Sequence, residues 1–357
     1  MFKVFFHALD KERTKKGQIC RRIRINHLHF WKNSWDKREA RFSLHLCLEK
    51  GAKIMTDSML YQARNYRSFM ETSKLLFMQL RPKQWTKNML VFAAFTFSID
   101  KMHPGAVIHS LTAFILFSFV SGCVYILNDY MDREADRQHP DKRHRPMASG
   151  RLNPQLAVAF GFVLFVCSMA AAVREHPLFA LLLFIYFALN VAYSLALKQV
   201  VIIDIMIIAA GFVLRALGGG IVIQVHFTPW FLLCVFLLSL LLAIGKRRHE
   251  FMLLQNDKGT HRKVLDKYSE TLLDQMTGIV TTATIISYSM FTFLSGRTIH
   301  LMWTIPFVIY GVFRYLYLIH VLGKGGKPEE LLLQDTGIVT TVMTYGISVV
   351  FILKAFG

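Results

Sequence analysis

The sequence predicts an all-α integral membrane protein with nine transmembrane helices around a central cavity. Of its 357 residues, 54% are hydrophobic and 18% are charged, whereas soluble domains usually carry about a quarter charged residues. From about Met89 to the C-terminus, apolar runs recur at lengths near or above the roughly 18 residues that cross a bilayer. Together these features exclude an ordinary cytosolic enzyme, a disordered chain and a secreted disulfide-rich domain.

Nine apolar stretches are the candidate transmembrane helices, and the first is the shortest. Basic residues gather in the connections before the first, third, fifth, seventh and ninth stretches, and the intervening connections carry few. Because basic loops stay on the cytoplasmic side, this alternation predicts the N-terminus inside and the C-terminus outside. The stretches cover about 88–101, 106–130, 155–173, 177–197, 201–222, 229–245, 272–294, 302–321 and 337–355.

Residues 1–75 differ in composition from the transmembrane domain predicted over 76–357. The first 80 residues hold 17 Lys and Arg against 7 Asp and Glu, a large part of the formal net charge of +19. A basic and aromatic membrane-surface anchor is one interpretation. We favour a poorly ordered extension, with the functional start at Met55 or Met59, and expect deletion of residues 1–54 to leave activity nearly intact. The basic residues form no single continuous face, so they fit anionic lipid or phosphate ligands rather than nucleic acid.

An acidic motif ends the second apolar stretch. At about 100° per residue, Asn128, Asp129, Asp132 and Asp136 would share one face of a helix. Such close carboxylates repel each other unless a cation lies between them, and oxygen ligands without His or Cys suit Mg²⁺. The alternative is a helix cap with solvated charges, which the position directly after a membrane span disfavours.

A basic loop follows the acidic motif. Arg143 and Arg145 lie in the Pro- and Gly-containing run 139–151, where guanidinium groups can hold phosphate oxygens through paired hydrogen bonds. The same cations can simply mark a cytoplasmic loop. Composition does not separate these two interpretations, and both can hold at once.

Two charged residues fall within the fifth apolar stretch. Asp204 and Arg215 share a helix face but lie about three turns apart, so they cannot pair directly. Each must face a partner or a watery cavity, because a lipid-facing charge costs at least about 2.5–3.5 kcal/mol. We expect Asp204 to orient Lys198 and Arg215 to be structural. Asn190 is expected to form interhelical hydrogen bonds, whereas Tyr193 and Lys198 are candidate ligand contacts.

The acidic motif and the run Arg145-Pro146-Met147-Ala148-Ser149-Gly150 together resemble the first signature of the UbiA-type prenyltransferase superfamily. The resemblance covers about residues 78–357. Members are nine-helix membrane enzymes whose Asp-rich motifs bind Mg²⁺–diphosphate in a cytoplasm-facing central cavity. It therefore implies a UbiA-like transferase domain in a bacterial-type plasma membrane, with Mg²⁺ as cofactor and an active site that faces the cytoplasm.

Further runs are similar to the branch of this superfamily that transfers a 5-phosphoribosyl group to decaprenyl phosphate. A second Asp-rich motif is typical of the prenyltransferases proper. Here the corresponding loop offers acidic residues over 257–274 without the usual spacing, which favours the phosphoribosyl branch. The similar runs are Arg81-Pro82-Lys83-Gln84-Trp85-x-Lys87-Asn88, Tyr193-Ser194-x-x-Leu197-Lys198, Asp204 with Leu214-Arg215, Gly245-Lys246-Arg247-Arg248-x-Glu250, Arg262-Lys263-Val264-Leu265, Tyr268-Ser269 and Pro328-Glu329-Glu330-Leu331.

The hypothesis is a Mg²⁺-dependent transferase that moves a phosphoribosyl group from phosphoribosyl diphosphate to a polyprenyl phosphate. The lipid phosphate is already anionic, so no general base is required. The predicted catalytic residues are Asp129, Asp132 and Lys198. The predicted metal ligands are Asn128, Asp129, Asp132 and Asp136. The predicted substrate-binding residues are Arg81, Lys83, Lys87, Asn88, Arg143, Arg145, Tyr193, Lys246, Arg247 and Arg248.

Two alternatives stay open at this point. A polyprenyl-diphosphate transferase would use the same metal motif but would ionise the lipid and require an aromatic acceptor. A non-enzymatic membrane protein such as a transporter could also hold charges inside a helix bundle. The sequence contains no internal repeat or paired broken helices of the kind found in many transporters.

Overall fold

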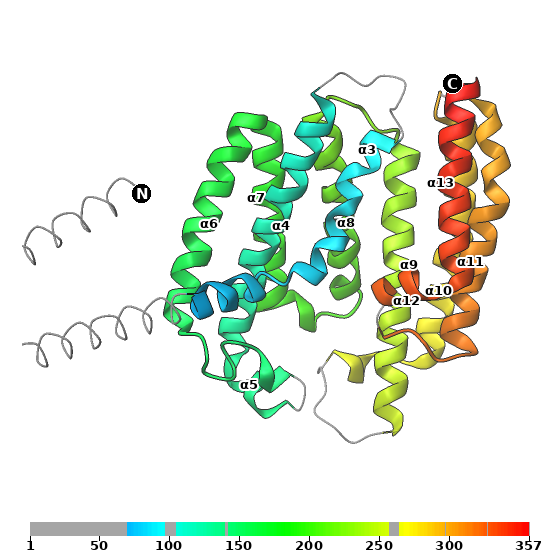
Figure 1. The fold of residues 1–357 in the computed structure, drawn as a ribbon. Helices are drawn as coiled ribbons and strands as arrows, with labels where there is room; N and C mark the ends of the chain where they lie inside the picture. Colours follow the sequence, from blue (N-terminus) through cyan, green and yellow to red (C-terminus); the bar gives the residue numbers. More distant parts are fainter. Residues whose placement is uncertain are drawn as a thin grey trace, which may run out of the picture. The chain divides into compact units, whose positions relative to one another are not determined.

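The computed structural model describes residues 70–96, 105–139, 142–256, 264–296, 298–326 and 328–356, and every regular element in these ranges is helical (Figure 1). The predicted all-α class is confirmed for this part of the chain. Almost all of the N-terminal extension predicted over 1–75 lies outside the described residues, so its character stays a prediction. The helices discussed below belong to one compact unit, Thr72–Gly357.

Eight helices in the described ranges are long and apolar enough to cross a membrane. They follow the second to ninth predicted stretches, but the helix predicted over 229–245 continues to Asn256. Lys, Arg and Glu follow its apolar run, and these residues favour helix nearly as well as Leu does. The helices are α4 (Ala106–Met131), α6 (Pro154–Glu175), α7 (Pro177–Leu195), α8 (Ile203–Val222), α9 (Pro229–Asn256), α10 (Glu270–Leu294), α11 (Ile305–His320), which continues the 3₁₀-helix η6 (Ile299–Thr304), and α13 (Thr336–Phe356).

The first predicted stretch, 88–101, does not form one regular α-helix. The chain instead forms an eleven-residue 3₁₀-helix, η1 (Pro82–Phe92), and one α-helical turn, α3 (Ala93–Thr96). A 3₁₀-helix of this length is uncommon, so tertiary packing must hold it. A Cβ at Gly219 of α8 would lie 1.9 Å from the carbonyl oxygen of Val91, which shows how closely the η1 backbone approaches α8. The ninth span and the outside position of the C-terminus stay predictions.

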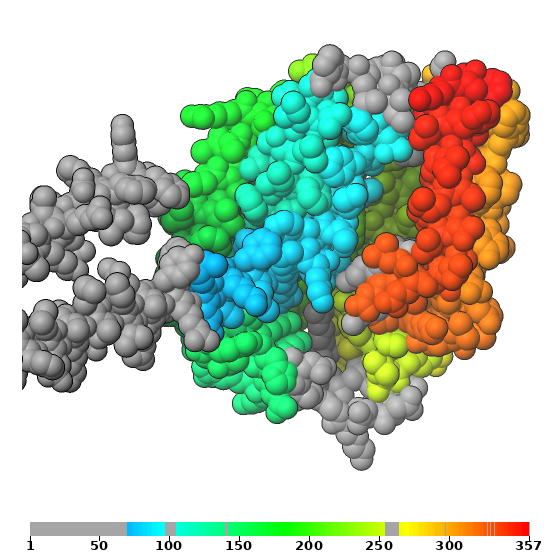
Figure 2. Space-filling model, in the orientation of Figure 1, coloured from blue at the N-terminus to red at the C-terminus, as the bar shows by residue number. Residues whose placement is uncertain are grey.

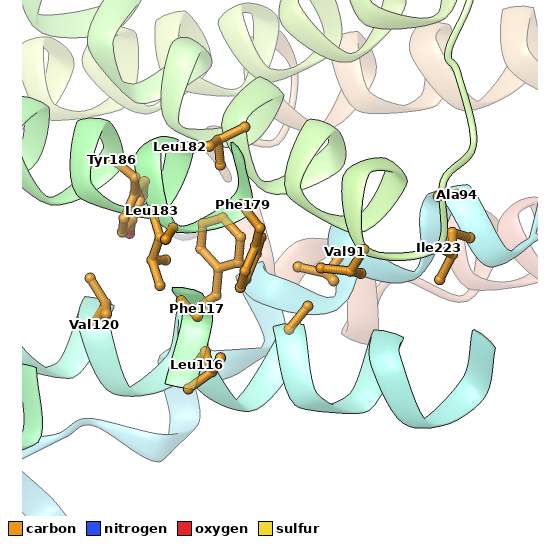
Figure 3. Packing of buried hydrophobic residues seen from close by; sticks show 14 of the residues in the cluster. Val91, Ala94, Leu116, Phe117, Val120, Phe179, Leu182, Leu183, Tyr186 and Ile223 are labelled. Carbon is orange, nitrogen blue, oxygen red and sulfur yellow. The ribbon is translucent and has the colours of Figure 1, made fainter. Parts of the chain in front are cut away.

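The N-terminal half of the bundle packs around α4, which contacts η1, α6, α7 and α8. Figure 3 shows the centre of this core, where the rings of Phe117 and Phe179 meet edge-on with centroids 5.8 Å apart. Leu183 and Val91 are fully buried beside them. A Cβ at Gly218 would lie 2.6 Å from the ring of Phe117, so α8 needs a glycine where it passes this pair.

The C-terminal half forms a second core, and α8 and α9 join the two halves. α9 packs against both α8 and α10, and α11 packs against α13 (Figure 1). Leu241 and Ile244 of α9 are fully buried against Ile205 of α8, Leu273 of α10 and Leu318 of α11. The α8–α9 contact therefore carries the connection between the halves.

Large apolar side chains also cover the outside of the helices. Phe162, Ile279 and Phe351 are each about two-thirds exposed, although they belong to transmembrane candidates. Such exposure is expected where the surrounding solvent is lipid rather than water. Figure 2 shows the surface hollowed between the blue and cyan chain around η1 and the orange and red chain of α12 (Pro328–Gln334) and α13.

Candidate active site

The predicted acidic motif lies where α4 ends. α4 stops at Met131, Asp132 leaves the helical conformation (φ −87°, ψ 5°), and the short helix α5 (Arg133–Gln138) follows. The prediction that these four residues share one face of a continuous helix is therefore wrong, because the helix is interrupted at Asp132. The break has a chemical consequence, because Asp132 has a different partner from Asp129 and Asp136.

Asp129 is buried and accepts three hydrogen bonds. Its Oδ1 accepts from Arg81 Nη2 at 2.5 Å and from Arg145 Nη1 at 2.9 Å, and its Oδ2 accepts from Gln79 Nε2 at 2.5 Å. Arg81 precedes η1 with a left-handed backbone (φ 52°), and its guanidinium lies 4.8 Å from the ring centroid of Tyr125. A buried carboxylate is costly unless it is paired, so the two guanidinium groups compensate the charge of Asp129.

Arg145 links the basic loop to the acidic motif. Its Nη1 donates to Asp136 Oδ2 at 2.6 Å as well as to Asp129, and Lys142 Nζ lies 4.0 Å from Asp136 Oδ1. The loop is also held by packing, because Met147 is buried in a small apolar cluster at this end of α4. The side chain of Arg145 is still 26% exposed. The guanidinium that bridges two carboxylates is thus also open to a ligand.

Asp132 forms the third pair of the site. Its Oδ1 lies 3.4 Å from Nζ of Lys198, which belongs to the 3₁₀-helix η4 (Leu197–Gln199) between α7 and α8. The Asp132 side chain is 38% exposed, far more than the other two carboxylates of the motif. Asn128, one turn earlier on α4, is half-buried. Its side chain forms no hydrogen bond with the residues that the structure describes.

The fit of Mg²⁺ depends on these differences. No three His, Cys, Asp or Glu side chains in the described ranges are arranged to hold a metal ion by themselves. Mg²⁺, however, is often bound through one or two carboxylates and fills its other positions with water and substrate phosphates. Asp132 and Asn128 meet that requirement, whereas Asp129 and Asp136 already hold Arg145. The residues present therefore fit a Mg²⁺ ion that binds together with a phosphate ligand.

A second charged network lies between α7, α8 and α9. Arg247 of α9 donates from Nε to Asp204 Oδ2 at 2.6 Å, from Nη1 to Glu250 Oε2 at 2.6 Å and from Nη2 to Tyr193 Oη at 3.3 Å. The Arg247 side chain is 2% exposed and that of Asp204 is fully buried. Every nitrogen of this guanidinium thus has a protein partner. The direct phosphate contact expected of Arg247 does not match this geometry.

Asp204 pairs differently from the sequence-based expectation. It accepts from Arg247 and, through Oδ1, from Tyr268 Oη at 2.7 Å. Lys198, which Asp204 was expected to orient, instead pairs with Asp132. Tyr268 Oη also accepts from the backbone N–H of Ile202 at 2.8 Å. Burial raises the pKa of the Tyr268 hydroxyl, so the hydroxyl stays protonated at neutral pH and can donate to Asp204.

The remaining predicted basic residues differ in exposure. Lys83 and Arg143 are exposed, and neither forms an ion pair with a carboxylate of the described ranges. Lys87 and Lys246 are half-buried and have interaction partners. Arg248 is mostly buried and pairs with Asp274 Oδ1 at 2.7 Å. Lys83 and Arg143 are therefore the cations that stay most open to a phosphate.

Three predicted polar residues form contacts deeper in the bundle. Asn88 is buried, and its Oδ1 accepts from Arg215 Nε at 2.7 Å. Arg215 Nη2 also donates to Tyr186 Oη at 2.7 Å, which supports the structural role expected of Arg215 and makes Asn88 part of the same support for η1. Asn190 donates to the carbonyl of Tyr186 at 2.8 Å. Both residues belong to α7, so the prediction of an interhelical hydrogen bond is wrong.

Sequence reasoning missed Gln79 and assigned no role to Tyr268. Gln79 lies in a helical stretch over 70–79 and contacts Asp129, fifty residues away. Its buried Oε1 has no hydrogen-bond partner in the described ranges. Tyr268 contacts a backbone amide 66 residues away. No local signal marks either residue, because their partners are set by how the helices pack.

The fold and the site define a polytopic helical membrane protein with carboxylates and cations clustered where α4 ends. The chain belongs to the UbiA prenyltransferase family, whose model matches residues 89–328. It is 34% identical over 264 residues to the decaprenyl-phosphate phosphoribosyltransferase of Mycobacterium tuberculosis, covering 72% of this chain and 86% of that one. The protein of the same name from Corynebacterium glutamicum is also 34% identical, over 72% of this chain and 80% of that one.

The fold likeness extends to a solved structure. A UbiA homologue from Archaeoglobus fulgidus bound to GPP and Mg²⁺ matches with a TM-score of 0.60 and 18% identity, covering 78% of this chain and 99% of that chain. The family resemblance inferred from the motifs is thus confirmed. The protein is an enzyme of the transferase class, and the non-enzymatic alternative is set aside.

Proposed function

We propose that the protein transfers a phosphoribosyl group from phosphoribosyl diphosphate to a polyprenyl phosphate in a Mg²⁺-dependent reaction. The curated relatives, named decaprenyl-phosphate phosphoribosyltransferases, support this donor and acceptor class. The observation that carries the proposal is the group of partly exposed cations paired with the acidic motif. Arg81, Arg145 and Lys198 each contact a motif carboxylate and keep about a quarter of the side chain exposed.

The cations can exchange a carboxylate partner for a phosphate partner. Arg81 and Arg145 compensate Asp129, and Lys198 compensates Asp132. An incoming diphosphate brings several charged oxygens, which guanidinium groups hold through strong, charge-assisted hydrogen bonds. The exposed Lys83 and Arg143 add positive charge that attracts the donor. Asp132 and Asn128 are the residues that would hold Mg²⁺, which neutralises charge on the diphosphate when it is bound.

The chemistry needs no proton acceptor from the protein. The bond between the anomeric carbon and the diphosphate oxygen breaks, and the diphosphate leaves with the electron pair. A phosphate oxygen of the lipid then forms the new bond to the same carbon. Arg81, Arg145 and Lys198 stabilise the negative charge that develops on the leaving group, which is the kind of interaction that accelerates a reaction most. The lipid phosphate is anionic at neutral pH and attacks without deprotonation.

The polyprenyl chain requires an apolar path that opens to lipid. The hollow between η1 and α12–α13 in Figure 2 is a candidate for this path, since the apolar transmembrane helix α13 borders it. The positive loops that carry Arg143, Arg145 and Lys198 favour a cytoplasmic location for the charged end of the bundle, where the acidic motif lies. The sugar donor would then arrive from the cytoplasm and the acceptor from the membrane.

The direct test compares two donors in membranes that contain the protein. Labelled phosphoribosyl diphosphate with a polyprenyl phosphate should give labelled lipid, and EDTA should abolish the product until Mg²⁺ is restored. The matched control is the Asp132→Asn variant expressed to the same level. If labelled prenyl diphosphate and an aromatic acceptor give product instead, the enzyme is a prenyltransferase of the type left open by the sequence, and the proposal is wrong.

A further inference from the structure

The turn between η4 and α8 has an unusual backbone. Ile202 has φ 70° and ψ −48°, and the N–H of Ile203 donates to the carbonyl of Val201 at 2.8 Å. This is a γ-turn with positive φ, which is rare and strained. The strain is greater for a β-branched residue, which rarely adopts positive φ. Strained backbone persists only where the surroundings impose it, and it often lies at functional sites.

Tyr268 supplies the restraint from a different part of the chain. It follows the short 3₁₀-helix η5 (Leu265–Lys267), and its side chain is buried against the second core. Its hydroxyl accepts from the N–H of Ile202 at 2.8 Å and donates to Asp204 Oδ1 at 2.7 Å. Asp204 is fixed in turn by Arg247. The hydroxyl is therefore held on one side by the strained turn and on the other by a buried ion pair.

The strained turn is connected to the active site through Lys198. Lys198 precedes Ile202 by four residues, and backbone hydrogen bonds from Val200 to Leu197 and from Asp204 to Val200 span the intervening segment. Nζ of Lys198 lies 3.4 Å from Asp132 Oδ1. A change at the turn would consequently move the lysine relative to the acidic motif.

We propose that Tyr268 is a positioning residue that sets the placement of Lys198 by holding the strained turn at Ile202. The proposal rests on the proposed function, in which Lys198 stabilises the departing diphosphate. This role requires no contact between Tyr268 and the substrate. It acts through the segment 198–204 and so joins the region after α9 to the acidic motif at the end of α4.

The test starts from Tyr268→Phe, which keeps the ring and removes only the hydroxyl. Misplacement of a group that acts in the transition state lowers kcat more than it changes KM. We expect kcat to fall roughly tenfold to a hundredfold, since a displacement of about 1 Å can have such an effect. KM for both substrates should stay within about twofold of the wild type, which is the kinetic signature of a contact made only in the transition state.

The matched control is Tyr288→Phe on α10. Its hydroxyl is also buried and bonded, at 2.5 Å to Thr304 Oγ1, but it lies far along α10 from the charged end. It should reduce thermal stability in detergent without lowering kcat per folded molecule. If Tyr268→Phe loses only stability, as this control does, the positioning role is overturned.

Ile202→Gly provides the rescue. Glycine adopts positive φ without a Cβ penalty, so the turn should form without the tyrosine hydroxyl. The double variant Ile202→Gly/Tyr268→Phe should recover most of the kcat that Tyr268→Phe loses. If Tyr268→Phe does not fold, the double variant is compared with Ile202→Gly alone, and the two should have equal kcat. A double variant much slower than Ile202→Gly overturns the proposal.

All variants are measured with both donors beside the wild type. If the wild type turns over prenyl diphosphate but not phosphoribosyl diphosphate, the proposed function is refuted. The role of Tyr268 is then tested by comparing the kcat of the variants with prenyl diphosphate as donor. A wild-type kcat for Tyr268→Phe with the active donor refutes the positioning role alone.

Discussion

Two arginine–carboxylate clusters near the charged end of the bundle use the same residue types in opposite ways. Arg145 joins Asp129 and Asp136 and is about a quarter exposed, whereas Arg247 joins Asp204 and Glu250 and is almost completely buried. In the proposed function, the first cluster exchanges a protein partner for a ligand. In the second, every guanidinium nitrogen is already bonded. The two clusters differ in exposure rather than in charge, and exposure distinguishes the proposed binding site from the buried support.

The largest effect on activity should come from Asp132→Asn. This change removes the charge of the most exposed carboxylate of the motif and little volume. We expect transfer to fall roughly 10²–10³-fold, the range for loss of one electrostatic contribution to the transition state. The measurement is product formation in membranes at saturating Mg²⁺. Glu175→Gln, which alters a carboxylate paired with His109 away from the motif, serves as the control and should be fully active.

Near-normal activity of Asp132→Asn would remove the metal role from this residue. It would also contradict the functional difference between the clusters, because the exposed pair would then be no more functional than the buried one.

Substitutions in the buried cluster should lower the stability of the folded protein. Arg247→Gln leaves Asp204 buried without its charge partner, which typically costs about 3–5 kcal/mol. We expect a large drop in the thermal stability of the detergent-solubilised protein and in the amount of folded protein. Arg247→Lys keeps the charge but not the paired hydrogen-bond geometry. Its thermal stability should therefore lie between that of the wild type and that of Arg247→Gln. If Arg247→Gln folds and its only defect is a raised KM for phosphoribosyl diphosphate, the result would support the direct phosphate contact predicted from the sequence.

Arg145→Gln should show the opposite pattern. The folded protein should persist, because Arg81 still pairs with Asp129 and Lys142 still lies 4.0 Å from Asp136, while KM for phosphoribosyl diphosphate rises. Charged hydrogen bonds contribute about 1.5–3 kcal/mol, so the rise should be roughly 10- to 100-fold. KM for the lipid phosphate should change little, and Arg145→Lys should give a partial defect. A lipid-only effect would mean that donor and acceptor sites are reversed.

The smallest effect is expected at an ion pair outside both clusters. Arg314 donates to both oxygens of Asp335, which precedes α13, and this contact lowers the pKa of the Asp335 carboxyl. A lowered pKa stabilises the fold above the unfolded value near 4, and the contribution is lost as the pH falls through the folded value. Asp335→Asn should lower Tm by on the order of 1–2 °C at pH 7. The difference should shrink as the pH falls below about 4, and a difference that does not shrink would exclude this carboxylate as its cause.

The sequence predicted most of the helices and the position of the acidic motif at the end of the second stretch, but not the partners of the motif carboxylates. Apolar length and the alternation of basic loops are local properties, so eight of the nine predicted stretches coincide with membrane-length helices of the described residues. The first stretch differs because its backbone packs closely against Gly219 of α8 and is held as η1. Asp129, Asp132 and Asp136 were recognised from their spacing, but their partners were not, since Lys198 lies 66 residues from Asp132.

The membrane class, the position of the acidic motif and the family can all be predicted from the sequence alone. These depend on composition, hydropathy and motif spacing, all of which can be read over short distances. Which charged side chains stay open to a ligand depends instead on how the helices pack. Arg247 and Arg145 lie in similar basic runs, yet burial between α8 and α9 commits the first to Asp204, while the end of α4 leaves the second open. Burial sets the cost of an unpaired charge, and helix packing, not local sequence, sets burial.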